Sequence, residues 1–310
     1  MNKYAFLFSG QGSQYPGMGQ ELLNIDPSLE EVFTCASDIL GFDLKNACFN
    51  FSASELAKTS ISQPAIMTIS LLGFKLASKL GITPLCVAGH SLGEYAAMIA
   101  SKVISLEDGY KIIKARAAAM QNCADNQNGA MCAVMGLSTD ELTKICNNSN
   151  YYVAPVNFNS LSQTVVAGEK PGVDEVIAAV SAIGKRAVPL AVSAAFHSKL
   201  MQPAADEFYC AIKNMTFSVA QCDFYSNMNA GVLTDFLDMP SYLAKHLVSP
   251  VMFVDELNNM KTAGCDVFLE MGPGKVLTGL VKKTLCDVTS FNLENAKTYE
   301  KLADFVAKEN

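Results

Sequence analysis

Short apolar runs that end at glycine-rich turns recur along the chain, and a helix-like pattern follows each of them. The first run, Tyr4–Phe8, leads into a turn at residues 9–14, and helical elements begin near Met18. Continuously apolar strands that alternate with helices are typical of a largely parallel sheet covered by helices. The pattern therefore predicts an α/β fold. The other two units are residues 85–88 with 94–102, and Val267–Met271 with 276–283.

Between residues 126 and 193 the pattern changes to shorter elements. It indicates a strand, a helix, two strands, a second helix and a final strand, and Ser138 is placed to cap the first helix. This order is the ferredoxin-like signature. We therefore expect a small α+β subdomain at residues 126–193, inserted into a larger α/β unit formed by residues 1–125 and 194–310. The expected elements are residues 131–137, 139–148, 151–158, 163–167, 171–183 and 185–192.

Composition and charge exclude several classes of protein. Half of the 310 residues are hydrophobic and 17% are charged, which excludes a disordered chain. The chain carries 23 basic and 30 acidic residues, and it has no Lys/Arg cluster that could neutralise nucleic-acid phosphates. The longest uncharged stretch, residues 145–168, contains several Asn and a Pro, so it does not predict a membrane-spanning helix. Without a signal-peptide pattern, we expect a cytoplasmic protein that binds neither nucleic acid nor membrane.

The ten cysteines form neither a metal-binding nor a disulfide pattern. They are scattered along a long chain, none stands in a Cys-x-x-Cys pair, and no Cys/His group has the spacing of zinc ligands. Several lie in apolar stretches, among them Cys86 and Cys132. We therefore interpret them as reduced core residues and expect no metal site.

A candidate nucleophile stands at residues 89–93, where Gly-His-Ser-Leu-Gly matches the Gly-x-Ser-x-Gly nucleophile elbow. A serine hydroxyl is a weak nucleophile, so it needs exposure on a sharp turn, a base, and donors for the developing oxyanion. The flanking glycines allow the turn, and the backbone amide of Leu92 can point at the oxyanion. The alternative is that Ser91 caps the following helix and Glu94 closes a capping box. The apolar strand before the turn favours the elbow.

The longer string Gly-His-Ser-Leu-Gly-Glu-Tyr at residues 89–95 closely resembles the active-site motif of the malonyl-CoA:acyl carrier protein transacylases, a family that includes stand-alone bacterial enzymes. It also resembles the acyltransferase domains of fatty-acid and polyketide synthases. Six further segments resemble the family in the same order, so the resemblance extends over nearly the whole chain. It implies an α/β-hydrolase-like core with a ferredoxin-like insertion. One departure is Ser9, where a proline is usual. The further segments are residues 8–14, 59–66, 116–121, 157–160, 195–201 and 270–277.

The resemblance implies a role for each of five residues. Ser91 would take an acyl group from a thioester, and His197 would act as general base and then as general acid. The backbone amides of Gln11 and Leu92 would bind the oxyanion. Arg116 would hold the malonyl carboxylate through two parallel hydrogen bonds. Three of these residues also have a simpler interpretation: His197 as a structural residue, Arg116 as a solvated helical residue, and Gln11 as part of a glycine-rich turn.

Four more positions are candidates with less defined roles. Gln63 and Asn159 are expected to line the pocket, whereas His90 is expected to point away from the nucleophile as a structural residue. His246 stands where bacterial relatives usually carry Gln. In the family a main-chain carbonyl at this position orients the base histidine, and every residue keeps that carbonyl. The alternative is that His246 adds a second titrating imidazole near the site.

The resemblance therefore implies an acyltransferase that moves a malonyl group from malonyl-CoA to the phosphopantetheine thiol of holo acyl carrier protein. The reaction would pass through a malonyl ester on Ser91 and supply extender units for fatty-acid or polyketide synthesis. We expect a monomer that uses no cofactor. A serine hydrolase or esterase shares the elbow, and so does a catalytically silent scaffold that binds carrier protein. The presence of Ser91, His197 and Arg116 together argues against the scaffold.

Overall fold

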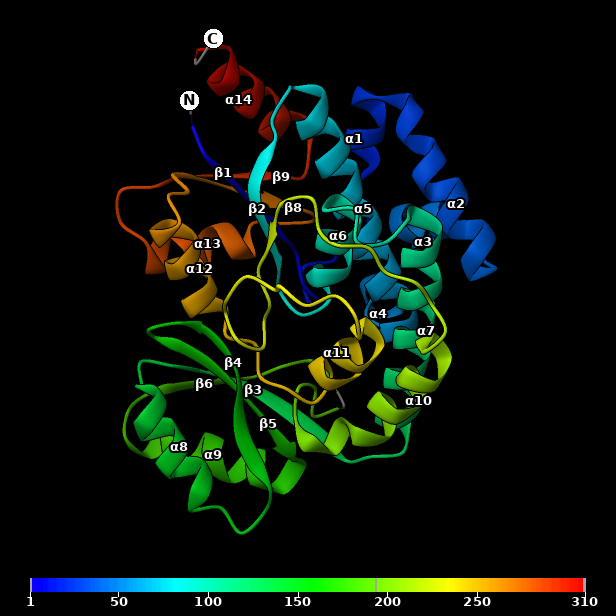
Figure 1. Cartoon of the computed structure of the whole chain (residues 1–310). Helices are drawn as coiled ribbons and strands as arrows, with labels where there is room; N and C mark the ends of the chain where they lie inside the picture. Colours follow the sequence, from blue (N-terminus) through cyan, green and yellow to red (C-terminus); the bar gives the residue numbers. More distant parts are fainter. Residues whose placement is uncertain (1, 193, 309–310) are drawn as a thin grey trace.

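The computed structural model describes residues 2–192 and 194–308, and two β-sheets organise them (Figure 1). The larger sheet is parallel and the smaller one is antiparallel, so the predicted α/β fold with a parallel sheet is confirmed. The larger sheet contains β1 (Tyr4–Phe8), β2 (Pro84–Gly89), β7 (Asp223–Phe224), β8 (Val267–Met271) and β9 (Thr289–Leu293), and the smaller one contains β3 (Gly129–Met135), β4 (Val153–Ser160), β5 (Gln163–Glu169) and β6 (Arg186–Pro189). In the described residues the strand orders are β7-β2-β1-β8-β9 and β4-β5-β3-β6.

The larger sheet is buried on both faces, as its central strand shows. Along β1, Tyr4, Phe6 and Phe8 point into one core, and Ala5 and Leu7 point into another. The two-residue period of a strand sends alternate side chains to opposite faces. Each Phe or Leu buried in this way contributes about 1.5–3 kcal/mol to folding. A strand without polar positions therefore fits the centre of a sheet that has helices on both sides.

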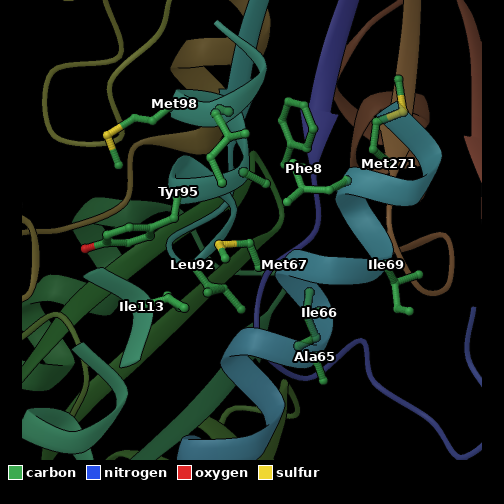
Figure 2. Packing of buried hydrophobic residues seen from close by; sticks show 14 of the residues in the cluster. Phe8, Ala65, Ile66, Met67, Ile69, Leu92, Tyr95, Met98, Ile113 and Met271 are labelled. Atoms are coloured by element: carbon green, nitrogen blue, oxygen red, sulfur yellow. The ribbon is translucent and has the colours of Figure 1, made fainter. Parts of the chain in front are cut away.

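Helices cover both faces of this sheet. On the side of Phe8 lie α5 (Thr59–Lys79) and α6 (Gly93–Ala100), and α7 (Leu106–Asp125) packs outside them. Figure 2 shows Met67 of α5, Tyr95 of α6 and Ile113 of α7 in this core. Within the described ranges no helix is long and apolar enough to cross a membrane. On the other face lie α12 (Phe253–Thr262) and α13 (Val276–Thr284), and the remaining elements of this part are α1 (Gln20–Ile25), η1 (Pro27–Leu29), α2 (Glu30–Leu40), α3 (Leu44–Asn50), α4 (Ala53–Leu56), η2 (Lys199–Met201), α10 (Gln202–Ile212), α11 (Met239–His246) and α14 (Ala296–Ala307).

The smaller sheet packs against two helices, α8 (Thr139–Asn147) and α9 (Lys170–Ala182), over a core of its own. The chain runs β3-α8-β4-β5-α9-β6, which is the order that the sequence predicts. Ser138 caps α8 as expected, in a capping box with Glu141. The last strand is shorter than the predicted residues 185–192, because the ladder between β6 and β3 covers Arg186–Pro189. Ser193, where the predicted insertion ends, lies outside the described residues.

Backbone contacts join the smaller sheet to the rest of the chain. The Phe158 N–H donates to the Val251 carbonyl at 2.8 Å, and the Val251 N–H donates to the Val156 carbonyl at the same distance. Gly129, at the start of β3, packs so closely against Ala195 that an added Cβ atom would lie 2.6 Å from the Ala195 nitrogen. The chain therefore enters and leaves the smaller sheet at one place, and the two sheets hold a defined relative position.

The turn between β2 and α6 packs against the end of β1 with no room for a Cβ atom at either glycine. A Cβ on Gly89 would lie 1.9 Å from the Gly93 carbonyl carbon, and a Cβ on Gly93 would lie 2.0 Å from the Phe8 carbonyl oxygen. A side chain at either position would have to displace backbone, which is costly in a packed interior. This close packing places residues 90–92 at the carboxyl edge of the parallel sheet, where ligands bind in such folds.

We expect Gly93→Ala to lower the free energy of unfolding by at least about 2 kcal/mol, because the added Cβ forces α6 away from β1. Gly279→Ala in α13 is the matched control, since nothing lies within 4 Å of its added Cβ. The control should raise the free energy of unfolding by about 0.5–1 kcal/mol, the usual gain of Ala over Gly inside a helix. Urea denaturation followed by circular dichroism measures both variants. Equal stability of Gly93→Ala and the wild type would contradict the packing argument.

Candidate active site

Ser91 stands at the tip of the turn between β2 and α6, with its hydroxyl directed at a histidine. Its φ of 53° lies in the left-handed region, which residues other than glycine rarely occupy and which is common at functional sites. Its Oγ lies 2.6 Å from Nε2 of His197. The helix-cap alternative does not describe this turn. α6 begins after Leu92 without a side-chain cap, and the Glu94 carboxyl accepts from the backbone N–H of Asn227 instead.

His197 comes from the segment that follows the smaller sheet, 106 positions from Ser91. Its Nδ1 lies 3.2 Å from the His246 carbonyl oxygen and 3.0 Å from the Ser249 carbonyl oxygen. A carbonyl can accept but not donate, so Nδ1 carries the proton and Nε2 is the acceptor that faces the Ser91 hydroxyl. The main-chain carbonyl of His246 thus stands where the resemblance places it. The carbonyl of Ser249 is a second partner that the sequence did not indicate.

The surroundings of His197 keep its imidazole uncharged. Burial, with smaller contributions from the nearby Arg116 and His90, lowers the pKa of His197 to about 3. The two carbonyls orient the ring without adding a negative charge that would favour the protonated form. At neutral pH the imidazole can therefore accept the hydroxyl proton of Ser91.

Arg116 is buried beside Ser91 rather than solvated on its helix. It is 1% exposed, its Nη2 lies 3.3 Å from the Ser91 Oγ, and its guanidinium carbon lies 5.1 Å from the centre of the Tyr95 ring. Burial lowers the pKa of Arg116, but a guanidinium stays charged in proteins. Its Nε has no hydrogen-bond partner among the described residues. A buried cation with an unused donor is suited to bind an anionic group.

A cavity of about 360 Å³ opens over Ser91 and His197, at the junction of the two sheets. Its volume lies in the range of sites for small molecules. It combines apolar side chains with the polar groups around the nucleophile. The larger part of the chain contributes Gln11, Met120 and Phe196 to its wall, and the part around the smaller sheet contributes Met131, Asn157 and Leu190.

Two candidate oxyanion donors are the backbone amides of Gln11 and Leu92. Gln11 belongs to the loop after β1 and lines the cavity, and Leu92 directly follows Ser91. Within the described part of the chain, neither amide donates a hydrogen bond to a protein group. Free amides beside a candidate nucleophile are the donors that an oxyanion hole requires.

Three side chains lie differently from what the sequence led us to expect. Gln63 is fully buried behind the cavity wall, where its amide contacts two of the lining residues. Asn159 also stands behind the wall and lies 2.8 Å from Nε2 of His90, and Asn157 lines the cavity instead. Register shifts in β4 on both sides of Asn157 change which residues face the cavity. His90, which was expected to point away, lines the cavity beside Ser91.

His246 is fully buried, and its imidazole makes contacts of its own. Its Nε2 lies 3.1 Å from Oδ1 of Asn227, and its Nδ1 lies 3.6 Å from Oε2 of Glu94. Burial lowers the pKa of His246 well below its ordinary value, so the geometry does not favour a second titrating imidazole. Burial also raises the pKa of Glu94 to about 8. The sequence did not indicate Asn227, which lies in a loop without a motif, 136 positions from Ser91.

Comparison with known proteins identifies the family of this chain. Residues 5–303 match the acyl transferase domain. The chain is 37% identical over 292 residues to the malonyl CoA-acyl carrier protein transacylase of Staphylococcus aureus. The aligned region covers 93% of this chain and 94% of that protein. The chain belongs to the malonyl CoA-acyl carrier protein transacylase family. This confirms the resemblance found in the sequence, and the protein is an acyltransferase.

Solved structures agree with the fold of this transacylase. The crystal structure of malonyl CoA-acyl carrier protein transacylase from Clostridium perfringens matches with a TM-score of 0.94 and 34% identity, over 99% of this chain and 98% of that one. A malonyl-transacylase in complex with its type II polyketide synthase acyl carrier protein matches with a TM-score of 0.94 and 32% identity, over 98% of this chain and 100% of that one.

We expect kcat/KM for acylation of the transacylase to stay constant as the pH is lowered through about 6.5, the ordinary pKa of histidine. The base acts while it is neutral, and a pKa of about 3 keeps His197 neutral until the pH approaches that value. His246→Gln should leave this profile unchanged, because it keeps the main-chain carbonyl and removes an imidazole that stays uncharged. Stopped-flow measurement of CoA release compares the two enzymes. A fall in rate near pH 6.5 that disappears in His246→Gln would instead identify His246 as the titrating group.

Proposed function

We propose that this transacylase moves a malonyl group from malonyl-CoA to the phosphopantetheine thiol of holo acyl carrier protein, through a malonyl ester on Ser91. The observation that carries the proposal is the buried Arg116 next to the serine–histidine pair, because its Nη2 lies 3.3 Å from the Ser91 Oγ and its Nε has no partner among the described residues. The similar transacylase in complex with its acyl carrier protein supports the choice of acceptor. Malonyl groups on a carrier protein serve as extender units for fatty-acid or polyketide synthesis.

In the first half-reaction the Ser91 Oγ attacks the thioester carbonyl of malonyl-CoA, and Nε2 of His197 takes the hydroxyl proton. The negative charge moves to the carbonyl oxygen, to which the free amides of Gln11 and Leu92 donate. Collapse of the tetrahedral intermediate breaks the carbon–sulfur bond, and His197 returns the proton to the leaving sulfur. The products are the malonyl ester of Ser91 and free CoA.

In the second half-reaction the carrier's phosphopantetheine thiol takes the place of the serine hydroxyl. The thiol gives its proton to Nε2 of His197, and its sulfur attacks the ester carbonyl. The intermediate again places its charge between the amides of Gln11 and Leu92. The bond from the carbonyl carbon to the Ser91 Oγ then breaks, and His197 protonates that oxygen. One acyl-enzyme between two substrates makes the mechanism ping-pong, and no step needs a metal or a cofactor.

In the proposed reaction, Arg116 makes the enzyme specific for the malonyl group. A malonyl group differs from an acetyl group by a free carboxylate. A planar guanidinium can bind that carboxylate through two parallel charge-assisted hydrogen bonds, which are strong where water is excluded. An acetyl group would leave the buried cation without an anionic partner, which disfavours its binding.

The proposal includes the architecture of the family. We assign residues 1–125 and 194–310 to an α/β-hydrolase-like core and residues 126–193 to a ferredoxin-like small subdomain. The strand orders of the two sheets and the close packing of Gly129 against Ala195 support an insertion rather than two successive domains. A monomer in the cytoplasm, without nucleic-acid or membrane partners, stays a prediction from the sequence.

We expect Ser91→Ala to abolish formation of the acyl-enzyme, because the attacking oxygen is removed. Intact-mass spectrometry after incubation with malonyl-CoA should detect one malonyl group on the wild type and none on the variant. Ser54→Ala, an exposed position in α4, is the matched control and should be acylated like the wild type. A malonyl adduct retained in Ser91→Ala would refute the assignment of the nucleophile.

The same acyl-enzyme separates the proposed transferase from its rivals. Its ester should persist in buffer and disappear when holo carrier protein is added. A serine hydrolase would discharge the ester at the same rate with and without the carrier. A silent scaffold would release no CoA on mixing with malonyl-CoA.

We expect Arg116→Ala to reduce malonyl transfer about 30-fold or more, as is typical when one partner of a buried charged pair is removed. Acetyl transfer should be unchanged or faster, because an acetyl group makes no use of the guanidinium. Transfer of both groups from their CoA esters to holo carrier protein measures the difference. Arg186→Ala, at the exposed end of β6, is the matched control and should leave both rates unchanged. Equal loss of both activities in Arg116→Ala would make that arginine a structural residue.

A further inference from the structure

We propose that Asn227 is a positioning residue for the nucleophile, and that its side-chain amide holds the Ser91 turn in the conformation that the reaction requires. The proposal rests on Ser91 being the nucleophile of the proposed function, but not on the identity of the acyl group. Asn227 lies in the loop after β7 and is fully buried behind the turn.

The amide of Asn227 bridges the two sides of the turn. Its Oδ1 accepts from the backbone N–H of Ser91 at 2.7 Å, and its Nδ2 donates to the Gly89 carbonyl at 2.6 Å. A backbone N–H can donate but not accept, and a backbone carbonyl can accept but not donate. These two partners therefore determine which way the amide faces. An amide is needed here, because the turn presents one donor and one acceptor.

The remaining hydrogen-bonding capacity of the amide is also used. Oδ1 accepts from Nε2 of His246 at 3.1 Å, and Nδ2 donates to Oε1 of Glu256 at 2.9 Å. The backbone N–H of Asn227 donates to Oε1 of Glu94 at 2.6 Å. An Asn side chain has two donors and two acceptor sites, and all four have partners here. Such a network locks the side chain in one orientation, which a residue that only fills space would not require.

The conformation of Ser91 explains why the turn needs this support. Its φ of 53° is unfavourable for a residue with a Cβ atom and persists where the surroundings hold it. Rotation of the turn toward a relaxed conformation would move the Ser91 Oγ away from His197. It would also move the Leu92 amide, which follows Ser91 directly. Nucleophile and oxyanion donor would thus be displaced together.

His246 connects this support to the general base. Its imidazole donates to Asn227, and its main-chain carbonyl lies 3.2 Å from Nδ1 of His197. The base His197 and the nucleophile Ser91 are therefore both connected to one buried residue, Asn227. His197 requires only the main-chain carbonyl of His246. The contact with Asn227 gives the His246 side chain a role of its own.

Asn227→Asp is the most informative variant, because Asp has nearly the same shape. It keeps an oxygen for the Ser91 N–H but places a second oxygen against the Gly89 carbonyl, where the two repel. We expect the acylation rate at saturating malonyl-CoA to fall about 10- to 100-fold, as for small displacements of reacting groups. Binding of malonyl-CoA, measured in Ser91→Ala enzyme with and without Asn227→Asp, should change by less than about 2-fold, since the turn and not the cavity is altered.

A pH series separates positioning from loss of structure. Burial should raise the pKa of the carboxyl that Asn227→Asp introduces, and the protonated form of that carboxyl can donate to the Gly89 carbonyl again. The acylation rate of the variant relative to wild type should therefore rise as the pH is lowered. The other titratable groups facing this position are present in both enzymes and largely cancel in the ratio. They are Glu94 from α6, Arg116 from α7, Tyr242 and His246 from α11, Glu256 from α12, and His197.

Asn229→Asp is the matched control, because Asn229 is exposed in the same loop and uses its Oδ1 to accept from the Gly231 N–H. Asp can accept in the same way, so its acylation rate should equal that of the wild type at every pH. The proposal would be overturned if Asn227→Asp acylated at the rate of Asn229→Asp. It would also be overturned if rate and binding fell together with no recovery at low pH.

Two His246 variants keep the proposal testable if Asn227→Asp fails to fold. His246→Leu removes the donor to Asn227 and should slow acylation, whereas His246→Gln keeps an N–H for Asn227 and should recover most of the rate. Equal rates of the two variants would overturn the proposal. The rates are read with whichever acyl-CoA acylates Ser91, so a failure of the malonyl assignment would be seen separately, in the wild type.

Discussion

The close approach between the β2–α6 turn and the end of β1 is the constraint on which the site depends. The backbone of Gly89 and Gly93 lies against other backbone, so α6 and β1 can be packed in one way. That packing places Ser91 at the edge where the parallel strands end. Because neighbouring parallel strands end at the same edge, the loop after β1 brings Gln11 to the same place. The proposed nucleophile and the proposed oxyanion donors therefore follow neighbouring strands of one sheet.

Parts of the fold could be predicted to the residue, and the reason is burial. The strands Tyr4–Phe8 and Val267–Met271 are buried along their whole length, and apart from Glu270 all their residues are hydrophobic, so the hydrophobic runs end where the strands end. Edge strands carry no such signal. β6 is half exposed, and its length is set by its ladder with β3, which its own residues do not reveal. The order of elements in the smaller sheet was still predictable, because caps and periodicity are local.

In the site, local chemistry pointed to Ser91 and Leu92, while the roles of His197, Arg116 and Gln11 depended on resemblance to a family. The contributions of Asn227 and of the Ser249 carbonyl could not be predicted, because each acts across a long stretch of chain and carries no motif. The exchange of Asn159 for Asn157 on the cavity wall follows from register shifts in β4. Alternation along a regular strand does not reveal such shifts.

In the proposed mechanism, the pair of carbonyls behind His197 would also affect how long the ester on Ser91 survives. A carboxylate in their place would make the imidazole a stronger base, whereas carbonyls orient it and leave it weak. A weak base removes a proton far more readily from a thiol, whose pKa is about 8.5, than from water, whose pKa is about 15.7. The acidity of the attacking molecule can thus decide whether a thiol or water removes the acyl group from Ser91. The proposed acyl-enzyme would therefore persist in water and react when a thiol arrives.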